Sequence, residues 1–112
     1  MRQRHGRIVE SMTTVTISIG RNVGDKPLSA DRWLAFRYAV KSELGEGATV
    51  YVDGATSLGE WQGVSEESAT WVADITPERA SVLGRHLAKV ALEYGQDAIA
   101  LTLGETRLVT PR

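Results

Sequence analysis

The sequence predicts an α+β domain of the ferredoxin-like class, in which two helices cover one face of an antiparallel sheet. Four segments alternate apolar and polar side chains, as half-buried strands do. Two further segments repeat apolar residues at the three- and four-residue spacing of a helix. The order of these segments is strand, helix, strand, strand, helix, strand, which is the βαββαβ order of that sandwich.

The first half of the chain is expected to form a strand, a helix and a second strand. In the strand over residues 14–19, apolar side chains alternate with hydroxyl side chains. The two sets are Val15, Ile17 and Ile19 against Thr14, Thr16 and Ser18. Ser29 suits the N-cap of the helix that follows. The apolar face of this helix consists of Trp33, Phe36, Val40 and Leu44. The second strand is expected over residues 48–52.

The second half is expected to repeat this arrangement after a long polar connector, residues 54–68. A third strand is predicted over residues 69–74, and the pattern leaves its core-facing side open. Thr76 and Pro77 begin the second helix, because proline at the first helical position loses no hydrogen bond. The buried stripe of this helix consists of Ala80, Leu83, Leu87, Val90 and Tyr94.

The two ends of the chain complete the domain organisation. A fourth strand is expected over residues 98–103, with a hairpin turn at residues 104–105 into a short fifth strand, residues 106–109. Residues 1–11 are predicted to be a disordered basic leader before a single domain, residues 12–112. No apolar stretch of the length found in a secretory signal follows the basic residues, so a cytoplasmic protein is expected.

The composition argues against several classes of function. Thirteen basic and fourteen acidic residues nearly cancel, which disfavours direct nucleic-acid binding because that needs a surplus of positive charge. The chain has no cysteine, so thiol chemistry and disulfides are excluded. No apolar run approaches the length of a membrane-spanning helix, about 18 residues, and no membrane interaction is expected.

The charge is unevenly distributed along the chain. Between Ser42 and Glu78 there are eight acidic residues and no lysine or arginine. This region, residues 43–78, is interpreted either as a solvated loop or as an acidic surface that docks a basic protein partner.

The face of the sheet that is turned away from the helices is a candidate interaction surface. Small hydroxyl side chains let a flat sheet approach another surface closely, although threonine is also common on ordinary solvated strands. The hypothesis is a homodimer through this open sheet face. Its candidate residues are Thr14, Thr16, Ser18 and Tyr51.

The connector holds a second candidate, because Trp61 is a large apolar side chain among polar neighbours. Trp61 is interpreted either as a lid over the core or as an exposed anchor for a partner. The acidic residues of this partner surface are Glu60, Glu66 and Glu67. A different interpretation is a small-molecule or enzyme site in a cleft between the sheet and the connector. The lining of that cleft would be Arg21, Tyr51, Asp53, Glu60 and Trp61.

Signals of catalysis are weak, and no catalytic residue, metal ligand or cofactor is predicted. His5 and His86 do not have metal-ligand spacing. Glu66 and Glu67 are adjacent, so an extended chain points them apart, whereas a metal ion needs convergent ligands. The glycine-rich turn after the first strand lacks the Gly-Lys-Ser/Thr that ends a phosphate-binding loop.

Three motifs occur in order along the chain: GRNVGDKPLSADRWLAF, GEWQGVSEES and EYGQDAIAL. With this combination, residues 17–101 resemble a family of small bacterial proteins of unknown function. The chain departs from that family's Glu-Pro-Ser lead-in to the third strand, because it has Glu67, Ser68 and Ala69 there. The resemblance implies the ferredoxin-like pattern and supplies no catalytic residues. The sequence as a whole also resembles those of small proteins encoded by phages.

These observations favour a non-enzymatic protein-interaction or regulatory module. The working hypothesis is a phage accessory protein that acts on a host or phage protein. The alternative is a small-molecule-binding protein or enzyme that uses the cleft beside Trp61.

Overall fold

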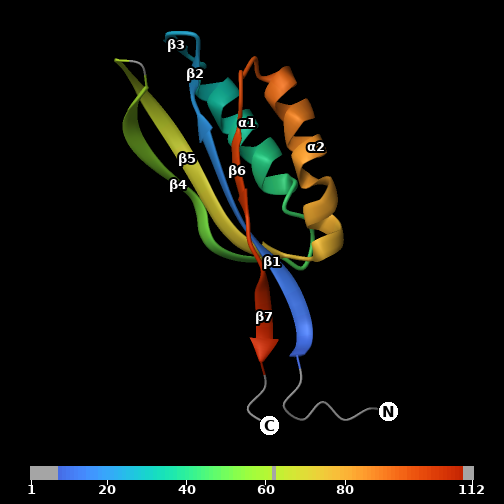
Figure 1. The fold of residues 1–112 in the computed structure, drawn as a ribbon. Coiled ribbons are helices and arrows are strands. Elements are labelled where there is room, and N and C mark those ends of the chain that lie inside the picture. Colours follow the sequence, from blue (N-terminus) through green and yellow to red (C-terminus); the bar gives the residue numbers. More distant parts are fainter. Residues whose placement is uncertain (1–7, 62, 110–112) are drawn as a thin grey trace.

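The structure of the protein, a computed structural model, describes residues 8–61 and 63–109. Two helices pack on one face of an antiparallel sheet with the strand order β4-β5-β1-β6 (Figure 1). This arrangement confirms the ferredoxin-like α+β fold. The elements in chain order are β1 (Ile8–Gly20), β2 (Asn22–Val23), β3 (Lys26–Pro27), α1 (Ala30–Ser42), β4 (Thr49–Trp61), β5 (Val64–Ile75), α2 (Pro77–Glu93), β6 (Ala100–Leu103) and β7 (Thr106–Val109).

The core lies between the helices and one face of the sheet. Its strand side chains come from alternate positions, which confirms the predicted pattern in β1. The buried strand residues include Val15, Ile17, Ile19, Trp71 and Ala73, and the helices contribute Trp33, Phe36, Val40, Leu83 and Leu87. Trp71 therefore faces the helices, which settles the side that the sequence left open. Phe36 also stacks on Tyr94 with 5.0 Å between the ring centroids, which joins α1 to the end of α2.

Both helices begin where the sequence predicts. The hydroxyl of Ser29 accepts a hydrogen bond from the backbone N–H of Arg32 at 3.2 Å, and Thr76 does the same for Arg79. Each cap satisfies an amide that has no partner within the helix. Within the described residues, neither helix is long and apolar enough to cross a membrane.

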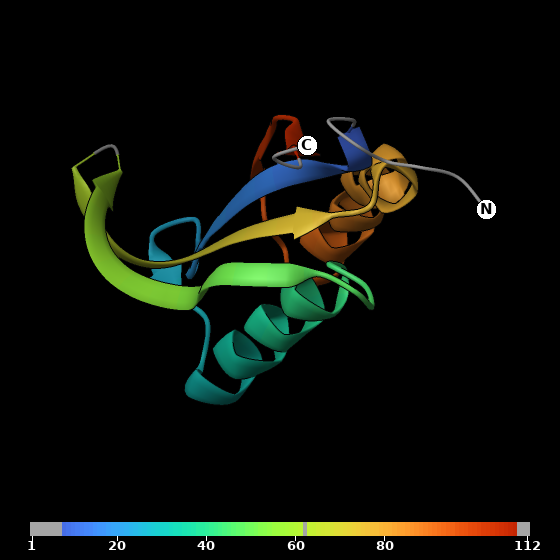
Figure 2. The same cartoon turned by 90° about the horizontal axis from the view of Figure 1, so that it is seen from below.

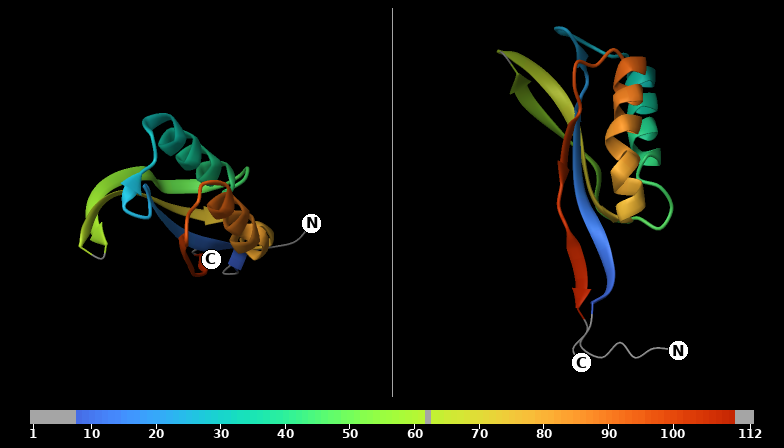
Figure 3. Two further views of the ribbon diagram at one scale, coloured as in Figure 1. Left: turned by 90° about the horizontal axis from the view of Figure 1, so that it is seen from above. Right: turned by 45° about the vertical axis from the view of Figure 1, so that its right-hand side comes forward.

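The predicted connector, residues 54–68, is wrong, because it forms a long β-hairpin. β4 and β5 pair along their length, from Thr49 opposite Asp74 to Trp61 opposite Val64. Alternation does not identify these strands because both faces of the outer part of the hairpin lie outside the core, so no buried face imposes a period of two there. We call residues 57–61 and 64–68 the arm. Figures 2 and 3 show that the arm bends away from the helices, toward the side of the open sheet face.

A backbone irregularity contributes to this curvature. The pairing of β4 with β5 shifts register twice, between Val50 and Val52 and between Asp53 and Ala55. Such bulges bend a strand and increase its twist. Gly54 sits in the second bulge with a φ of 73°, and a Cβ atom there would lie 3.2 Å from Cζ2 of Trp71. Glycine therefore fits this position both by conformation and by space.

The predicted hairpin between the fourth and fifth strands is also wrong. β6 and β7 both pair with β1, β6 along residues 15–18 and β7 along residues 8–12. The amide of Gly104 donates to the carbonyl of Thr14 at 2.8 Å, which keeps the chain beside β1 between the two strands. As a result β1 begins at Ile8, within the segment that the sequence assigns to the leader, because β7 supplies a pairing partner there.

Replacing Phe36 with alanine should destabilise the fold by about 3 to 5 kcal/mol, because a fully buried ring is lost and a cavity remains. Leu34 is the matched control on the same helix, since it is 60% exposed. Leu34→Ala should change the free energy of unfolding by less than about 0.5 kcal/mol. Denaturant unfolding of both variants measures the difference, and equal losses would contradict the assigned core.

Candidate functional site: the open sheet face and the base of the arm

The open sheet face, which is the face turned away from α1 and α2, carries the hydroxyl residues of β1. Thr14, Thr16 and Ser18 are half-buried, while the residues between them are buried in the core. Thr16 lies opposite Val72 and Ser18 opposite Thr70 in the register with β5. The hydroxyls of Ser18 and Thr70 are 3.1 Å apart. The structure thus places the three β1 candidates side by side on one surface.

Asp74 is the residue of this face that the sequence analysis did not single out. It is only 6% exposed, although it lies on the side of the sheet that the helices leave uncovered. Thr14 Oγ1 donates to its Oδ1 and Tyr51 Oη donates to its Oδ2, both at 2.5 Å. In the sequence Asp74 is one acid among eight, so only the strand register could show that these three side chains meet.

Tyr51 combines a fixed hydroxyl with an accessible ring. The residue is 62% exposed on the edge strand β4, while its hydroxyl is held by Asp74. The hydrogen bond to Asp74 is the main cause that raises the pKa of Tyr51 above the ordinary value of 10.0, and a phenolate beside that carboxylate would be repelled. The arrangement provides an aromatic surface whose orientation is set by a buried carboxylate.

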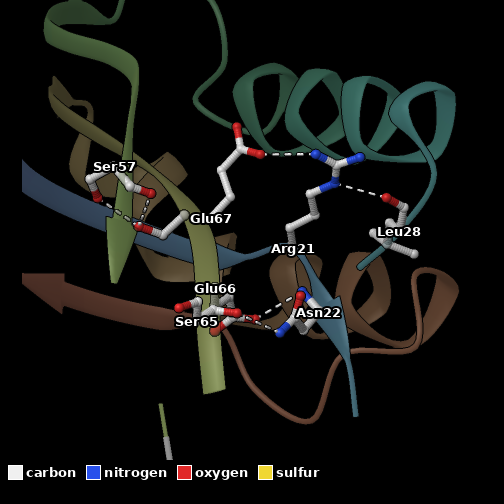
Figure 4. A network of polar contacts seen from close by, with 8 residues as sticks. Arg21, Asn22, Leu28, Ser57, Ser65, Glu66 and Glu67 are labelled. Atoms are coloured by element: carbon white, nitrogen blue, oxygen red, sulfur yellow. Dashed lines mark hydrogen bonds and ion pairs between the residues drawn. The ribbon is translucent and has the colours of Figure 1, made fainter. Parts of the chain in front are cut away.

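Glu66 and Glu67 point to opposite faces of β5, as the sequence predicts for adjacent residues of an extended chain (Figure 4). Glu67 lies on the helix side, where its Oε1 accepts from Nη1 of Arg21 at 2.9 Å. Arg21 also donates through Nε to the carbonyl of Leu28 at 2.8 Å. This pair ties the turn after β1 to the base of the arm.

The electrostatic environment of Glu67 favours its ionised form. The hydrogen bond from Arg21 is the largest cause that lowers the pKa of Glu67, and Trp33 and the charge of Arg37 act in the same direction. The indole Nε1 of Trp33 is buried and forms no hydrogen bond of regular geometry with a described residue. Ionised Glu67 therefore stabilises the fold above its ordinary pKa of 4.5, and this contribution is lost as the pH falls through the lowered value.

Glu66 crosses to the neighbouring strand on the open-face side. Its Oε2 accepts from the backbone N–H of Asn22 at 2.8 Å (Figure 4). A Cβ atom on Gly20 would overlap that same oxygen, so the glycine leaves the space that the carboxylate fills. Further along the arm, the hydroxyls of Ser57 and Ser68 are 2.8 Å apart.

The five residues proposed from the sequence to line one ligand cleft are not brought together. Tyr51 lies on the open face, whereas Arg21 is bound to Glu67 on the helix side. Asp53 pairs with Lys41 of α1 at 2.6 Å, also on the helix side. Glu60 is exposed near the end of the arm. The side chain of Trp61 lies outside the described residues, so its roles as lid or anchor stay predictions.

The acidic region, residues 43–78, is largely engaged within the chain. Five of its eight acids accept a hydrogen bond or form an ion pair: Glu43, Asp53, Glu66, Glu67 and Asp74. Glu43, for example, binds both Arg79 at 2.9 Å and His86 at 3.0 Å. In the described part of the chain, no group of three side chains is arranged to hold a metal ion.

The comparisons with known proteins identify a class of fold. No protein-family model and no curated protein matches the sequence. A solved structure of a phage SAM lyase in the apo state matches with a TM-score of 0.56 and 19% identity, over 98% of this chain and 90% of that one. A phage SAM lyase in complex with S-methyl-5'-thioadenosine matches with a TM-score of 0.53 and 17% identity, over 92% and 88%.

A more distant match is CutA1 from Oryza sativa, with a TM-score of 0.47, 14% identity and coverage of 88% of this chain and 82% of that one. At these identities the two phage SAM lyase matches, with TM-scores above 0.5, show a shared fold. The chain is thus a small α+β protein of the ferredoxin-like class, and phage proteins are among those that share its architecture.

The hydrogen bond between Tyr51 and Asp74 predicts a measurable titration. The chain should contain a tyrosine that ionises above the ordinary value of 10.0, and Tyr51→Phe should remove it. Asp74→Asn should move this ionisation back toward 10.0, because the hydrogen bond to the carboxylate is lost together with its negative charge. Absorbance at the tyrosinate band during alkaline titration measures both effects. A Tyr51 that titrates at or below the ordinary value would contradict the described contact.

Proposed function

We propose that this chain binds an adenosine-containing thioether or sulfonium ligand, such as S-methyl-5'-thioadenosine or S-adenosylmethionine, on the open sheet face beside Tyr51. The observation that carries the proposal is the Tyr51 ring, exposed at the sheet edge with its hydroxyl held by the buried Asp74. A nucleobase can stack on such a ring with little further loss of side-chain entropy, because the hydrogen bond to Asp74 already fixes the ring.

The neighbouring groups complement the remainder of such a ligand. Hydroxyls of Thr16, Ser18 and Thr70 offer donors and acceptors for a ribose. The carboxylate of Asp74 places negative charge beside Tyr51, which favours a positively charged sulfonium there. The structural similarity to a phage SAM lyase bound to S-methyl-5'-thioadenosine supports this ligand class, and it supports the hypothesis of a phage-encoded protein.

Tyr51→Ala should weaken the binding of S-methyl-5'-thioadenosine by about tenfold or more, the loss expected for one stacked base. Tyr51→Phe keeps the ring and should bind more tightly than Tyr51→Ala. Tyr38→Ala is the matched control, because Tyr38 is 75% exposed on α1 and far from the proposed site. Isothermal titration calorimetry measures the affinities. Absence of binding to the unaltered protein, or an equal loss in Tyr38→Ala, would refute the proposal.

The same face favours a second candidate function, which is self-association. The centre of the open face consists of small, half-buried side chains on β1 and β5, with no helix covering it in the described structure. We propose that a second copy of the chain, rather than a basic protein partner, packs against this centre while Tyr51 stays at the rim. Three of the eight acids in residues 43–78 are paired with a cation, which leaves less free charge for a basic partner.

Thr16→Arg tests this association, because it places a charge without a partner at the centre of the contact. The association constant should fall by about tenfold or more. Ala35→Arg, on the exposed surface of α1, introduces the same charge and should leave association unchanged. Sedimentation equilibrium of the two variants makes the comparison. A protein that is monomeric before any substitution, or a Thr16→Arg variant that associates normally, would overturn this candidate.

A further inference from the structure

A shallow groove runs along the other edge of the sheet, between α2 and β6. Its volume is about 410 Å³, and most of its lining is apolar. Gly84, Ala88 and Leu92 recur every fourth residue along α2, and Ile99 and Leu101 form the opposite wall. Leu92 is 82% exposed, so this edge presents apolar surface that nothing in the described structure covers.

β6 beside this groove is an edge strand. In the sheet order β4-β5-β1-β6, it pairs only with β1 among the described strands. An edge strand offers a row of backbone donors and acceptors to another strand. β4 is the edge at the opposite side of the sheet, so each copy of the chain carries two edges that can pair with each other between molecules.

The arm carries side chains that match the groove. Leu58 is 76% exposed and lies opposite Glu67 in the register, so it occupies the helix-side face of the arm. Glu60, two residues further along β4, lies on the same face. If the β4 edge of one copy continued the sheet of another at β6, Leu58 would be on the side of the second copy's α2.

The charges around the groove also complement the arm. Arg85 is exposed on α2 next to the groove residues Gly84 and Ala88 and forms no ion pair with a described residue. The arm brings Glu60, which is likewise exposed and outside the described ion pairs. Opposite charges at the rim of an apolar contact favour one orientation and one partner.

We propose that the arm of one copy lies in the groove between α2 and β6 of a second copy. The β4 edge pairs with β6, Leu58 fills the apolar groove, and Glu60 meets Arg85. Such a contact is head-to-tail, because each copy gives an arm and receives one, and it therefore builds rings or chains of copies. It uses the sheet edges, so it is a contact separate from the centre of the open face.

Cross-linking between two different variants tests this contact directly, because the chain has no cysteine of its own. Protein carrying Leu58→Cys is mixed with protein carrying Ala88→Cys under mild oxidation. A disulfide needs Cα atoms within about 7 Å, so a linked pair of chains should be the main product only if the arm occupies the groove. Leu34→Cys mixed with Ala88→Cys is the matched control from an exposed leucine on α1, and it should give no linked pair.

A charge exchange provides the second measurement. Glu60→Lys in the Leu58→Cys chain should reduce the yield of linked pairs, and Arg85→Glu in the Ala88→Cys chain should restore it. Circular dichroism checks that each variant is folded, and Glu60→Cys with Leu92→Cys replaces the first pair if either variant is not. Linking no greater than in the Leu34→Cys control, or Leu58→Cys linking only to itself, would overturn the proposal.

Discussion

The burial of only one face of the sheet is the constraint on which the other features of the molecule depend. α1 and α2 cover the side where Val15, Ile17 and Ile19 are at most 2% exposed, and they leave the opposite side uncovered. Because strand side chains alternate, a slip of one residue in β1 would bring threonines into the core. Core packing thereby fixes the register of β1 with β5. That register places Thr14 opposite Asp74, so an apolar requirement on one face determines where the polar contacts form on the other.

The arm obeys a different constraint, since no second layer covers it. Its strands are held by their mutual ladder and by contacts at its base, where Arg21 binds Glu67 and Asn22 binds Glu66. The two glutamates act on opposite faces of β5, which resists tilting of the arm to either side. An extended hairpin with free edges and exposed apolar side chains tends to pair with another chain. In the proposed contact, the arm of one copy covers the apolar groove of another copy, and the groove buries exposed side chains of the arm.

The sequence predicts those parts of the fold in which burial of one face produces a regular spacing of apolar residues. Alternation identified the two faces of β1, and Ser29 and Thr76 marked the beginnings of the helices. The arm could not be predicted in this way, because a hairpin exposed on both sides has no apolar period. The pairing of β7 with β1 could not be predicted, because a glycine at position 104 suggests a turn but does not show which strand the following segment pairs with. Asp74 was missed because its role depends on a partner sixty residues away in the sequence.

The proposed ligand site lies on the open face, and α1 supports the sheet from the opposite side. The most direct test is to follow the backbone amide signals of the labelled protein by NMR while S-methyl-5'-thioadenosine is added. We expect the shifted signals to cluster on the open face around Tyr51, Thr14 and Val72, with the exposed surface of α1 unaffected. Shifts confined to α1 and α2, or no shifts at saturating nucleoside, would contradict the central claim.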